Sequence, residues 1–266
     1  MDAGGAGSSL DWSLVQPEVA KFTRVCTIDR AGLGWSDPGP KGASSMRNVE
    51  ELEALLSNAK IEGPYIMVGH SFGGQNVRLY ASPHPDKVAG MVLVDSSHEE
   101  WAKIKFQAPW RTRLIEDARQ LIFGLYPILA RLGWLRLRHR PMGVDPGLPT
   151  EVRTVAPALG LRSRAFDWVP GVSTEIEASD NQLRNSPPLP DIPLTVLSAH
   201  TQYEPWGIPI DEADKYWMEL QADLASRVPN STHIVSETGG HSLHIDEPEL
   251  VIDAIRQVVE TVRASR

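Results

Sequence analysis

The chain has 266 residues, a formal net charge of −8 and a sequence pI near 5.5. This length suits one large domain, or one domain that carries an insertion. With 41% apolar and 23% charged residues, the composition is that of a folded protein rather than a disordered one. The acidic balance argues against a nucleic-acid surface, so we expect no nucleic-acid partner.

The sequence has few features that bear on its compartment, namely its first residues and its single cysteine. The first residues, MDAGGAGSSLDW, lack the basic region and apolar core of a secretory signal. The single cysteine, Cys26, excludes an intrachain disulfide and lies in an apolar run that we interpret as a buried strand. We therefore expect a reducing compartment, namely the cytoplasm.

The longest apolar window runs from residue 121 to residue 138. Gly, Pro and Arg interrupt it, so it is too short and too broken to span a bilayer, and we expect no integral membrane segment. Its basic end, with Arg136, Arg138 and Arg140, is compatible with a membrane surface. A buried amphipathic helix pair with a solvated rim is the commoner structure for such a stretch, and this is our prediction.

Between Lys21 and Val94 short apolar runs alternate with amphipathic segments. The pattern predicts strands at residues 22–29, 65–68 and 88–95, and helices at 48–60 and 73–81. Strand and helix alternate, and the apolar runs are continuous. This combination indicates a mostly parallel sheet covered by helices on both faces. The fold class is therefore α/β.

The pattern changes after Asp95. Residues 96–190 contain no convincing strand, and Trp, Arg, Leu and Pro are frequent there. The alternation then resumes, with strands predicted at 193–199 and 232–237 and helices at 213–227 and 248–265. We predict a core of residues 1–95 and 191–266, interrupted by a helical cap at 96–190. The cap would lie over the carboxyl ends of the strands, where open α/β sheets bind ligands.

A candidate nucleophile lies between a predicted strand and a predicted helix. Gly69-His70-Ser71-Phe72-Gly73 fits G-x-S-x-G, a string that chance alone supplies in roughly one chain in ten of this size. A strand before and a helix after are what a nucleophile elbow requires. Such a turn strains the backbone at Ser71, and glycine on either side relieves the crowding. The alternative is that Ser71 only caps the helix.

A serine hydroxyl is a poor nucleophile until a base takes its proton. His241 and His244 lie in TGGHSLHIDEPELV, between the last predicted strand and the last predicted helix. This loop is at the carboxyl end of a strand and can face Ser71. Two histidines three residues apart could instead bind a metal, but no third ligand cluster accompanies them, so we expect no metal.

At these motifs the chain resembles the α/β-hydrolase superfamily. GGHSLHIDEPE is similar to its last-strand motif, which implies that His241 is the catalytic base and that His244 is structural. DRAGLGWSDPG, at residues 29–39, resembles the turn after its fourth strand. The resemblance covers residues 3–95 and 191–266. It implies an α/β-hydrolase fold in which residues 96–190 have only the general character of a cap.

The position of the acid departs from the commonest pattern of the superfamily. In most members the acid follows the seventh strand, but here that strand ends in Ala-His-Thr-Gln, and the nearest carboxylate is Glu204. Some members, similar to haloalkane dehalogenases, place the acid at the end of the sixth strand, where this chain has Asp95. Because the base needs a carboxylate beside it, we predict Asp95 as the acid and keep Glu204 as the alternative.

Two backbone amides are expected to form an oxyanion hole. One is that of Phe72, directly after the nucleophile. The segment DAGGAGSSLDW is similar to the glycine-rich loop after the third strand of the superfamily, which implies Gly5 as the second donor. On this alignment the first two strands and nearly all of the third are absent. Truncation, a partner segment that fills the gap, and a wrong alignment remain open, as does a flexible glycine-rich terminus.

These residues predict a serine hydrolase that needs no cofactor. The resemblance implies a carboxylic ester of a small to medium apolar substrate, cleaved through an acyl-enzyme on Ser71. Hydrolysis of a carbon–carbon bond in a ring-fission diketone is an alternative with the same three side chains. A catalytically silent homologue that binds a small ligand is another. The sequence sets neither the natural substrate nor the oligomeric state.

Overall fold

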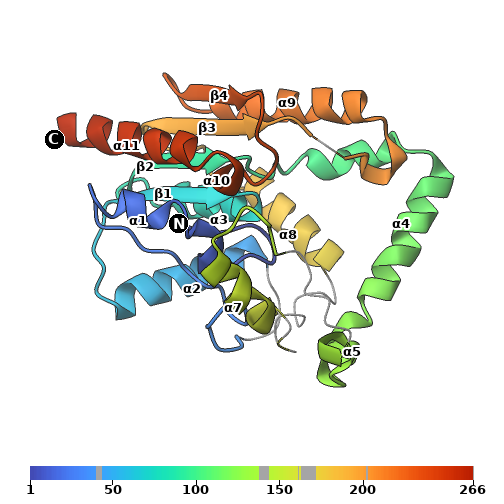
Figure 1. The fold of residues 1–266 in the computed structure, drawn as a ribbon. Helices are drawn as coiled ribbons and strands as arrows, with labels where there is room; N and C mark the ends of the chain where they lie inside the picture. Colours follow the sequence, from blue (N-terminus) through green and yellow to red (C-terminus); the bar gives the residue numbers. More distant parts are fainter. Residues whose placement is uncertain (40–43, 138–143, 161, 163–171, 202, 266) are drawn as a thin grey trace.

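The computed structural model describes residues 1–39, 44–137, 144–160, 162, 172–201 and 203–265. Its centre is a sheet of four parallel strands in the order β1-β2-β3-β4 (Figure 1). The strands are β1 (Tyr65–His70), β2 (Val88–Val94), β3 (Leu194–Ala199) and β4 (Thr232–Ser236). Strands were predicted at all four places. Because all pairs are parallel, every strand ends at the same edge of the sheet.

Helices cover both faces of the sheet. One face carries α3 (Phe72–Ala81), α2 (Ser45–Asn58) and α9 (Ile210–Ser226); the other carries α11 (Pro248–Ala264) and α1 (Gln16–Val19). The side chains of β2 alternate accordingly: Val92 and Val94 pack with α11, whereas Met91 and Leu93 pack on the α3 side. Both sets are fully buried, which explains the continuous apolar runs.

The strand predicted at residues 22–29 is wrong, since this segment forms no strand. In space, the short stretch from Met1 to Ala3 lies between this segment and β1. Met1 makes one hydrogen bond to Cys26 O (2.6 Å) and accepts one from Ile28 N (3.2 Å), too few for a ladder. Cys26 is exposed rather than buried, which corrects a second prediction.

The amino-terminal residues also continue the sheet edge beyond β1. Asp2 N donates to Val68 O (2.9 Å), and His70 N donates to Asp2 O (3.0 Å). These two bonds pair part of the β1 edge that the sequence alone would leave open. They also deliver the glycine-rich segment that follows, residues 4–7, to the end of β1, directly beside Ser71.

Between β2 and β3 the described residues form helices joined by turns and loops, and no strand. They are η2 (Trp101–Phe106), α4 (Trp110–Phe123), α5 (Tyr126–Arg131), α6 (Trp134–Leu137), α7 (Thr150–Gly160) and α8 (Val172–Arg184). In Figure 1, α4 runs along the outside of the molecule, away from the sheet, and α5 lies at its far end. The division into a core and a cap stays a prediction. No described helix is both long and apolar enough to cross a bilayer.

The buried helix pair predicted at residues 121–138 is wrong for the described part of that stretch. Ile122, Leu125, Ile128 and Leu132 are all more than half exposed. The sequence pattern shows which side of a helix is apolar, but not whether another element covers it. Of the predicted basic end, Arg138 and Arg140 lie outside the described residues.

Candidate active site

Ser71 occupies the tight turn between β1 and α3. Its backbone angles, φ 50° and ψ −119°, fall where residues other than glycine are rarely found. A Cβ on Gly69 would lie 2.5 Å from Gly73 O, and one on Gly73 would lie 2.4 Å from Asp2 O, so both flanking glycines are required. The side chain of Ser71 makes no capping bond to α3. The helix-cap alternative for Ser71 is therefore wrong.

The structure brings Asp95 and His241 into contact. Asp95 directly follows β2, and His241 lies in the loop between β4 and α11, so both side chains are at the carboxyl edge of the sheet. His241 Nδ1 donates to Asp95 Oδ2 at 2.6 Å. Asp95 is buried, whereas half of the His241 side chain is exposed. This bond fixes the imidazole so that Nε2 is free to accept a proton.

The second oxygen of Asp95 is also fully used. Oδ1 accepts from Ala199 N at the end of β3 (3.0 Å) and from Trp217 Nε1 on α9 (3.0 Å). Three hydrogen-bond donors therefore hold this buried carboxylate in place. Trp217 is a site residue that sequence reasoning missed. Only its spacing on an apolar helix face was visible, and this is the ordinary pattern of a core residue.

Glu204 does not occupy the corresponding place. It precedes the short turn η4 (Pro205–Gly207), and its side chain is exposed. His200, at the end of β3, bonds Asp214 Oδ2 on α9 (2.7 Å) and is exposed as well. Gln202, the last residue of the Ala-His-Thr-Gln sequence after β3, lies outside the described residues. The contact to His241 therefore comes from Asp95.

Two further histidines pack beside His241. His70 Nε2 donates to the backbone O of His241 (2.8 Å), which ties the histidine loop to the residue preceding Ser71. The ring of His244, in the short helix α10 (Leu243–Asp246), lies 4.3 Å from that of His70 and 4.9 Å from that of Trp12. Both histidines are buried. They support the loop that carries His241.

Burial keeps both histidines neutral. It is the main cause that lowers the pKa of His244 to about 3, with His241 adding to it. Burial, followed by the neighbouring His244 and His241, lowers the pKa of His70 well below its ordinary value. In the unfolded chain both would titrate near pH 6.5. The folded state therefore binds fewer protons than the unfolded state below that pH.

The protein is expected to lose stability on acidification from pH 6.5 downward. Each histidine held neutral in the fold and charged when unfolded lowers the free energy of unfolding by about 1.4 kcal/mol per pH unit. His244→Phe removes one such group, so its stability should fall less steeply between pH 6.5 and 3. Urea unfolding followed by circular dichroism across this range measures the slope. An unchanged slope in the variant would contradict the assignment to His244.

The glycine-rich segment is held by one buried arginine. Arg30 donates to Ala3 O (2.8 Å), to Gly4 O and to Gly5 O (2.6 Å), and it pairs with Asp2 Oδ1 (3.0 Å). Its guanidinium carbon also lies 5.8 Å from the ring centroid of Phe72. A Cβ on Gly4 would lie 3.4 Å from Ser71 Cβ, so the segment borders the turn that carries Ser71.

The two amides predicted for the oxyanion hole lie next to this turn. With the carbonyls of the segment bound to Arg30, Gly5 N–H makes no backbone bond to any residue that the structure describes. Phe72 is the first residue of α3, where a helix offers its N–H no acceptor. Sequence reasoning missed Arg30, because its contacts join segments that are distant along the chain.

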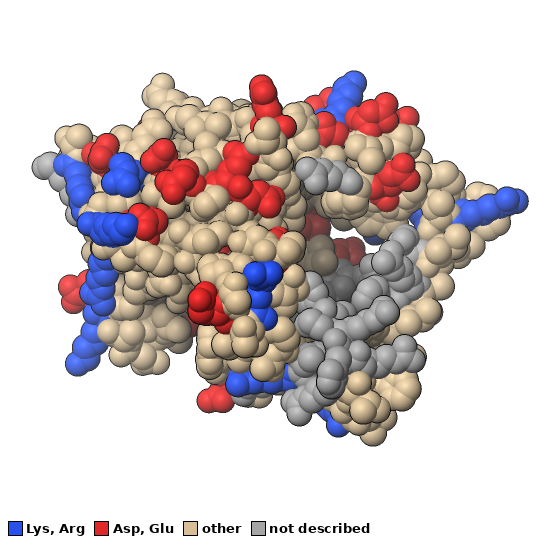
Figure 2. Space-filling view, in the orientation of Figure 1, with Lys and Arg blue, Asp and Glu red and all other residues tan. Residues whose placement is uncertain are grey.

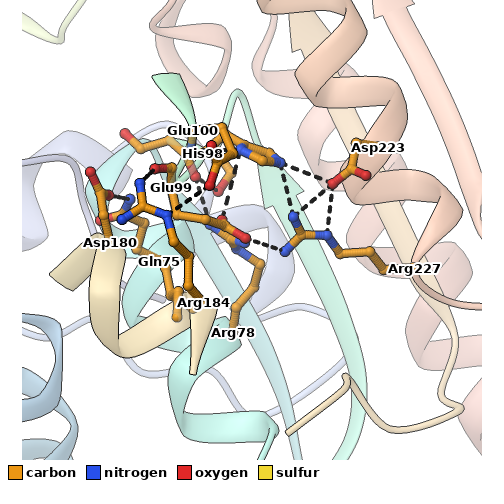
Figure 3. A network of polar contacts seen from close by, with 12 residues as sticks. Gln75, Arg78, His98, Glu99, Glu100, Asp180, Arg184, Asp223 and Arg227 are labelled. Carbon is orange, nitrogen blue, oxygen red and sulfur yellow. Dashed lines mark hydrogen bonds and ion pairs between the residues drawn. The ribbon is translucent and has the colours of Figure 1, made fainter. Parts of the chain in front are cut away.

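A network of ion pairs fixes the segment after Asp95 (Figure 3). Arg78 on α3 binds Glu99 Oε2 (2.8 Å) and Ser97 O (2.7 Å). Burial alone would raise the pKa of Glu99, but Arg78, His98 and Arg227 lower it to about 2. As a result Ser97 is held beside Ser71, with its Oγ 3.4 Å from Ser71 Oγ.

The same network reaches α8. Asp180 accepts from Gln75 Nε2 (2.9 Å), and burial raises its pKa to about 6 although Gln75 opposes the shift. Arg184, one turn further along α8, donates to Glu100 Oε1 (2.7 Å) and also to Glu99 O. The last helix before β3 is therefore tied to the segment that follows Asp95 and to the helix that follows Ser71.

The fold and these contacts define a parallel α/β protein with a strained serine turn and an Asp–His pair at the carboxyl edge of its sheet. Within the described residues, no three His, Cys, Asp or Glu side chains are grouped as a metal site would require. A model of the alpha/beta hydrolase family matches residues 3–254, and the chain belongs to that family.

Similar proteins agree on the fold and differ in the activities they are named for. "Uncharacterized protein YqjL" of Bacillus subtilis is 24% identical over 258 residues, 97% of this chain and 81% of that protein. A 2-hydroxymuconate semialdehyde hydrolase of a Pseudomonas species is 36% identical over 95 residues, 35% of this chain and 33% of that enzyme. A Thermogutta terrifontis esterase structure matches with a TM-score of 0.61 at 21% identity, covering 98% of this chain and 88% of that one. Such identity shows a shared fold and not a shared activity.

Proposed function

We propose that this protein is a serine hydrolase that cleaves carboxylic esters. The observation that carries the proposal is the buried Asp95 carboxylate bonded to His241 Nδ1, at the same edge of the sheet as a serine in a strained turn. An aspartate in this position holds a histidine in the tautomer that can accept a proton from a serine hydroxyl. A serine that served only structure would need neither the turn strain nor the neighbouring pair.

In the proposed reaction, Ser71 Oγ attacks the ester carbonyl carbon while its proton passes to His241 Nε2. The carbonyl oxygen becomes an oxyanion that accepts hydrogen bonds from Gly5 N–H and Phe72 N–H. The intermediate collapses, and the alcohol leaves with the proton from His241. A water molecule then gives a proton to His241 Nε2 and attacks the carbonyl carbon of the acyl-enzyme. The second intermediate collapses, His241 returns the proton to Ser71 Oγ, and the carboxylic acid is released.

Aromatic side chains beside His241 favour an apolar substrate. The ring of Trp217 lies 6.5 Å from that of His241, edge to face, and Trp101 lies 5.0 Å from Trp217. Apolar and aromatic side chains with a few convergent polar groups are typical of small-molecule sites. We infer a small to medium apolar acyl or alcohol group. No step of this reaction requires a cofactor.

Carbon–carbon bond hydrolysis is the second candidate. It is favoured by the similarity of about a third of the chain to the Pseudomonas 2-hydroxymuconate semialdehyde hydrolase. A ring-fission diketone offers the same carbonyl chemistry to Ser71 and His241, with a carbon leaving group in place of an alcohol. Assaying p-nitrophenyl esters and a ring-fission diketone in parallel separates the two candidates, because only one class should turn over efficiently.

A fluorophosphonate probe followed by intact-mass measurement tests the proposed nucleophile whatever the natural substrate. We expect one adduct on the wild type, none on Ser71→Ala and strongly slowed labelling of His241→Ala. Heat-denatured wild type is the control for non-specific labelling. No adduct on the folded wild type would contradict the proposal and favour a catalytically silent homologue.

Arg30→Met is expected to lower kcat by about 100- to 1,000-fold, with little change in KM. The substitution releases the carbonyls of Ala3, Gly4 and Gly5, so the Gly5 amide loses its fixed direction. Arg30 is a positioning residue here, because it acts through the loop and not on the substrate. Steady-state kinetics with a p-nitrophenyl ester measures the split between kcat and KM.

A second variant separates positioning from stability. Arg30→Met also leaves Asp2 buried without its cation, which costs about 3–5 kcal/mol of stability. Asp2→Asn/Arg30→Met removes that unpaired charge, so stability should largely return while kcat stays low. If kcat recovers together with stability, Arg30 has only a structural role.

A further inference from the structure

An arm of the molecule, residues 103–137, displays an unusual amount of apolar surface. Of the eighteen large hydrophobic side chains that are exposed among the described residues, ten lie in this arm. They are Phe106, Trp110, Leu114, Ile115, Ile122, Leu125, Ile128, Leu132, Trp134 and Leu137, with exposed fractions from 45% to 76%. Isolated exposed apolar residues are ordinary, but a contiguous set indicates an interaction surface.

The exposed residues form stripes along helices. On α4, Trp110, Leu114 and Ile122 are spaced by multiples of four, so they share one face with Ile115 at its edge. On α5 and at its two ends, Leu125, Ile128 and Leu132 are spaced by three and four residues and share one face, while Pro127 and Ala130 are buried on the opposite side. The arm thus leaves an apolar face exposed, where a helix normally presents polar residues.

The charge of this region is opposite to that of the whole protein. Residues 101–140 contain nine Lys and Arg and two Asp and Glu, a net charge of +7, whereas the whole chain carries −8. Among the exposed basic side chains, Lys105 lies over the ring of Phe106 (5.3 Å) and Arg111 over that of Trp110 (5.4 Å). Figure 2 shows acidic side chains over α9 and over the part of the molecule that contains the sheet, where Lys and Arg are interspersed among them.

We propose that the arm, residues 103–137, binds the surface of an anionic phospholipid bilayer. Apolar residues with Trp among them would enter the boundary between headgroups and acyl chains, while the adjacent Lys and Arg side chains pair with lipid phosphates. The acidic remainder of the protein would face away from the membrane. The arm lies in the membrane plane in this arrangement, and no described helix crosses the bilayer.

Charge favours a bilayer over a second copy of the chain. A symmetric contact between two copies would place two arms against each other, each with seven Lys and Arg and two Asp and Glu, a net charge of +5, and like charges across an interface are unfavourable. An anionic bilayer instead satisfies the apolar and the basic side chains together. This binding is independent of the proposed esterase activity, because it involves neither Ser71 nor His241.

Co-sedimentation with vesicles tests the proposal. We expect the wild type and Ser71→Ala to sediment with vesicles of equimolar phosphatidylcholine and phosphatidylglycerol, more weakly with phosphatidylcholine alone, and less at high salt. Leu114→Ser/Ile115→Ser should weaken binding on the order of 100-fold. Lys105→Gln and Arg111→Gln should each weaken it about five-fold. The side chains replaced in these arm variants are exposed, so little change in stability is expected, and circular dichroism checks the fold.

The matched controls are Leu55→Ser on α2 and Lys215→Gln on α9, exposed residues of the same chemistry outside the arm. They should bind as the wild type does. Equal loss in the controls, or no binding of the wild type to anionic vesicles, would overturn the proposal. A dimer in sedimentation velocity that Leu114→Ser/Ile115→Ser dissociates would also overturn it, since the face would then belong to a second copy.

Discussion

Replacing Ser71 by alanine is expected to lower kcat for ester hydrolysis on the order of 10⁶-fold. In the proposed mechanism the variant lacks the oxygen that forms the acyl-enzyme, and its remaining rate would come only from binding and the oxyanion donors. KM should change little, because the Ser71 hydroxyl contributes to the reaction more than to ground-state binding. Initial rates with a p-nitrophenyl ester, at enzyme concentrations set by active-site titration of the wild type, measure the loss.

Ser97→Ala is the matched control for this loss. Its hydroxyl lies 3.4 Å from that of Ser71, and its backbone N–H and carbonyl hold the turn, which alanine would preserve. We expect a loss of less than about ten-fold, since only a neighbouring hydroxyl is removed. If Ser97→Ala were the inactive variant and Ser71→Ala the active one, the nucleophile assignment would be wrong.

Serine and histidine should act as one unit. His241→Ala alone should cost about as much as Ser71→Ala, and the double variant no more than either, because neither side chain accelerates the reaction without the other. Additive losses would instead mean that the two residues contribute independently. Such a result would contradict proton transfer from Ser71 to His241.

Sequence reasoning succeeded where local rules decide the structure. The strands at the centre of the sheet are buried on both faces, so they are continuous apolar runs, and their places were predicted. Residues 22–29 have the composition of a strand, but a strand also needs a partner along its length. Within the described chain, Met1 supplies the backbone bonds to Cys26 and Ile28, and these are too few. Because that pairing is a tertiary property, the prediction failed.

The candidate site divides in the same way. Ser71 could be predicted because its turn is specified by adjacent glycines, and Asp95 because the family resemblance places an acid at the end of the strand that it follows. Trp217 and Arg30 could not, since each acts through contacts between segments that are distant along the chain. The prediction that the apolar face of α4 and α5 is buried failed for a related reason. Helical spacing predicts an apolar face, but only the packed structure shows that nothing described covers that face.

Glu204→Gln is the control variant for Asp95→Asn, because Glu204 is the alternative acid that the sequence left open. Glu204 is exposed, and the structure gives its side chain no contact to His241, so the substitution should change kcat less than about three-fold. Exposed substitutions away from a site also rarely change stability by more than about 0.5 kcal/mol. A large loss of kcat in Glu204→Gln would instead restore it as the acid.

Asp95→Asn is expected to lower kcat about 10⁴-fold while the protein remains folded. The amide oxygen introduced at this position can still accept from Ala199 N and Trp217 Nε1, so the new NH₂ group must point toward His241 Nδ1. Nδ1 then becomes an acceptor, and the proton moves to Nε2, which can no longer take one from Ser71. Steady-state kinetics measures the loss, and thermal unfolding checks the fold. A variant that retained wild-type kcat would contradict Asp95 as the residue that orients the base.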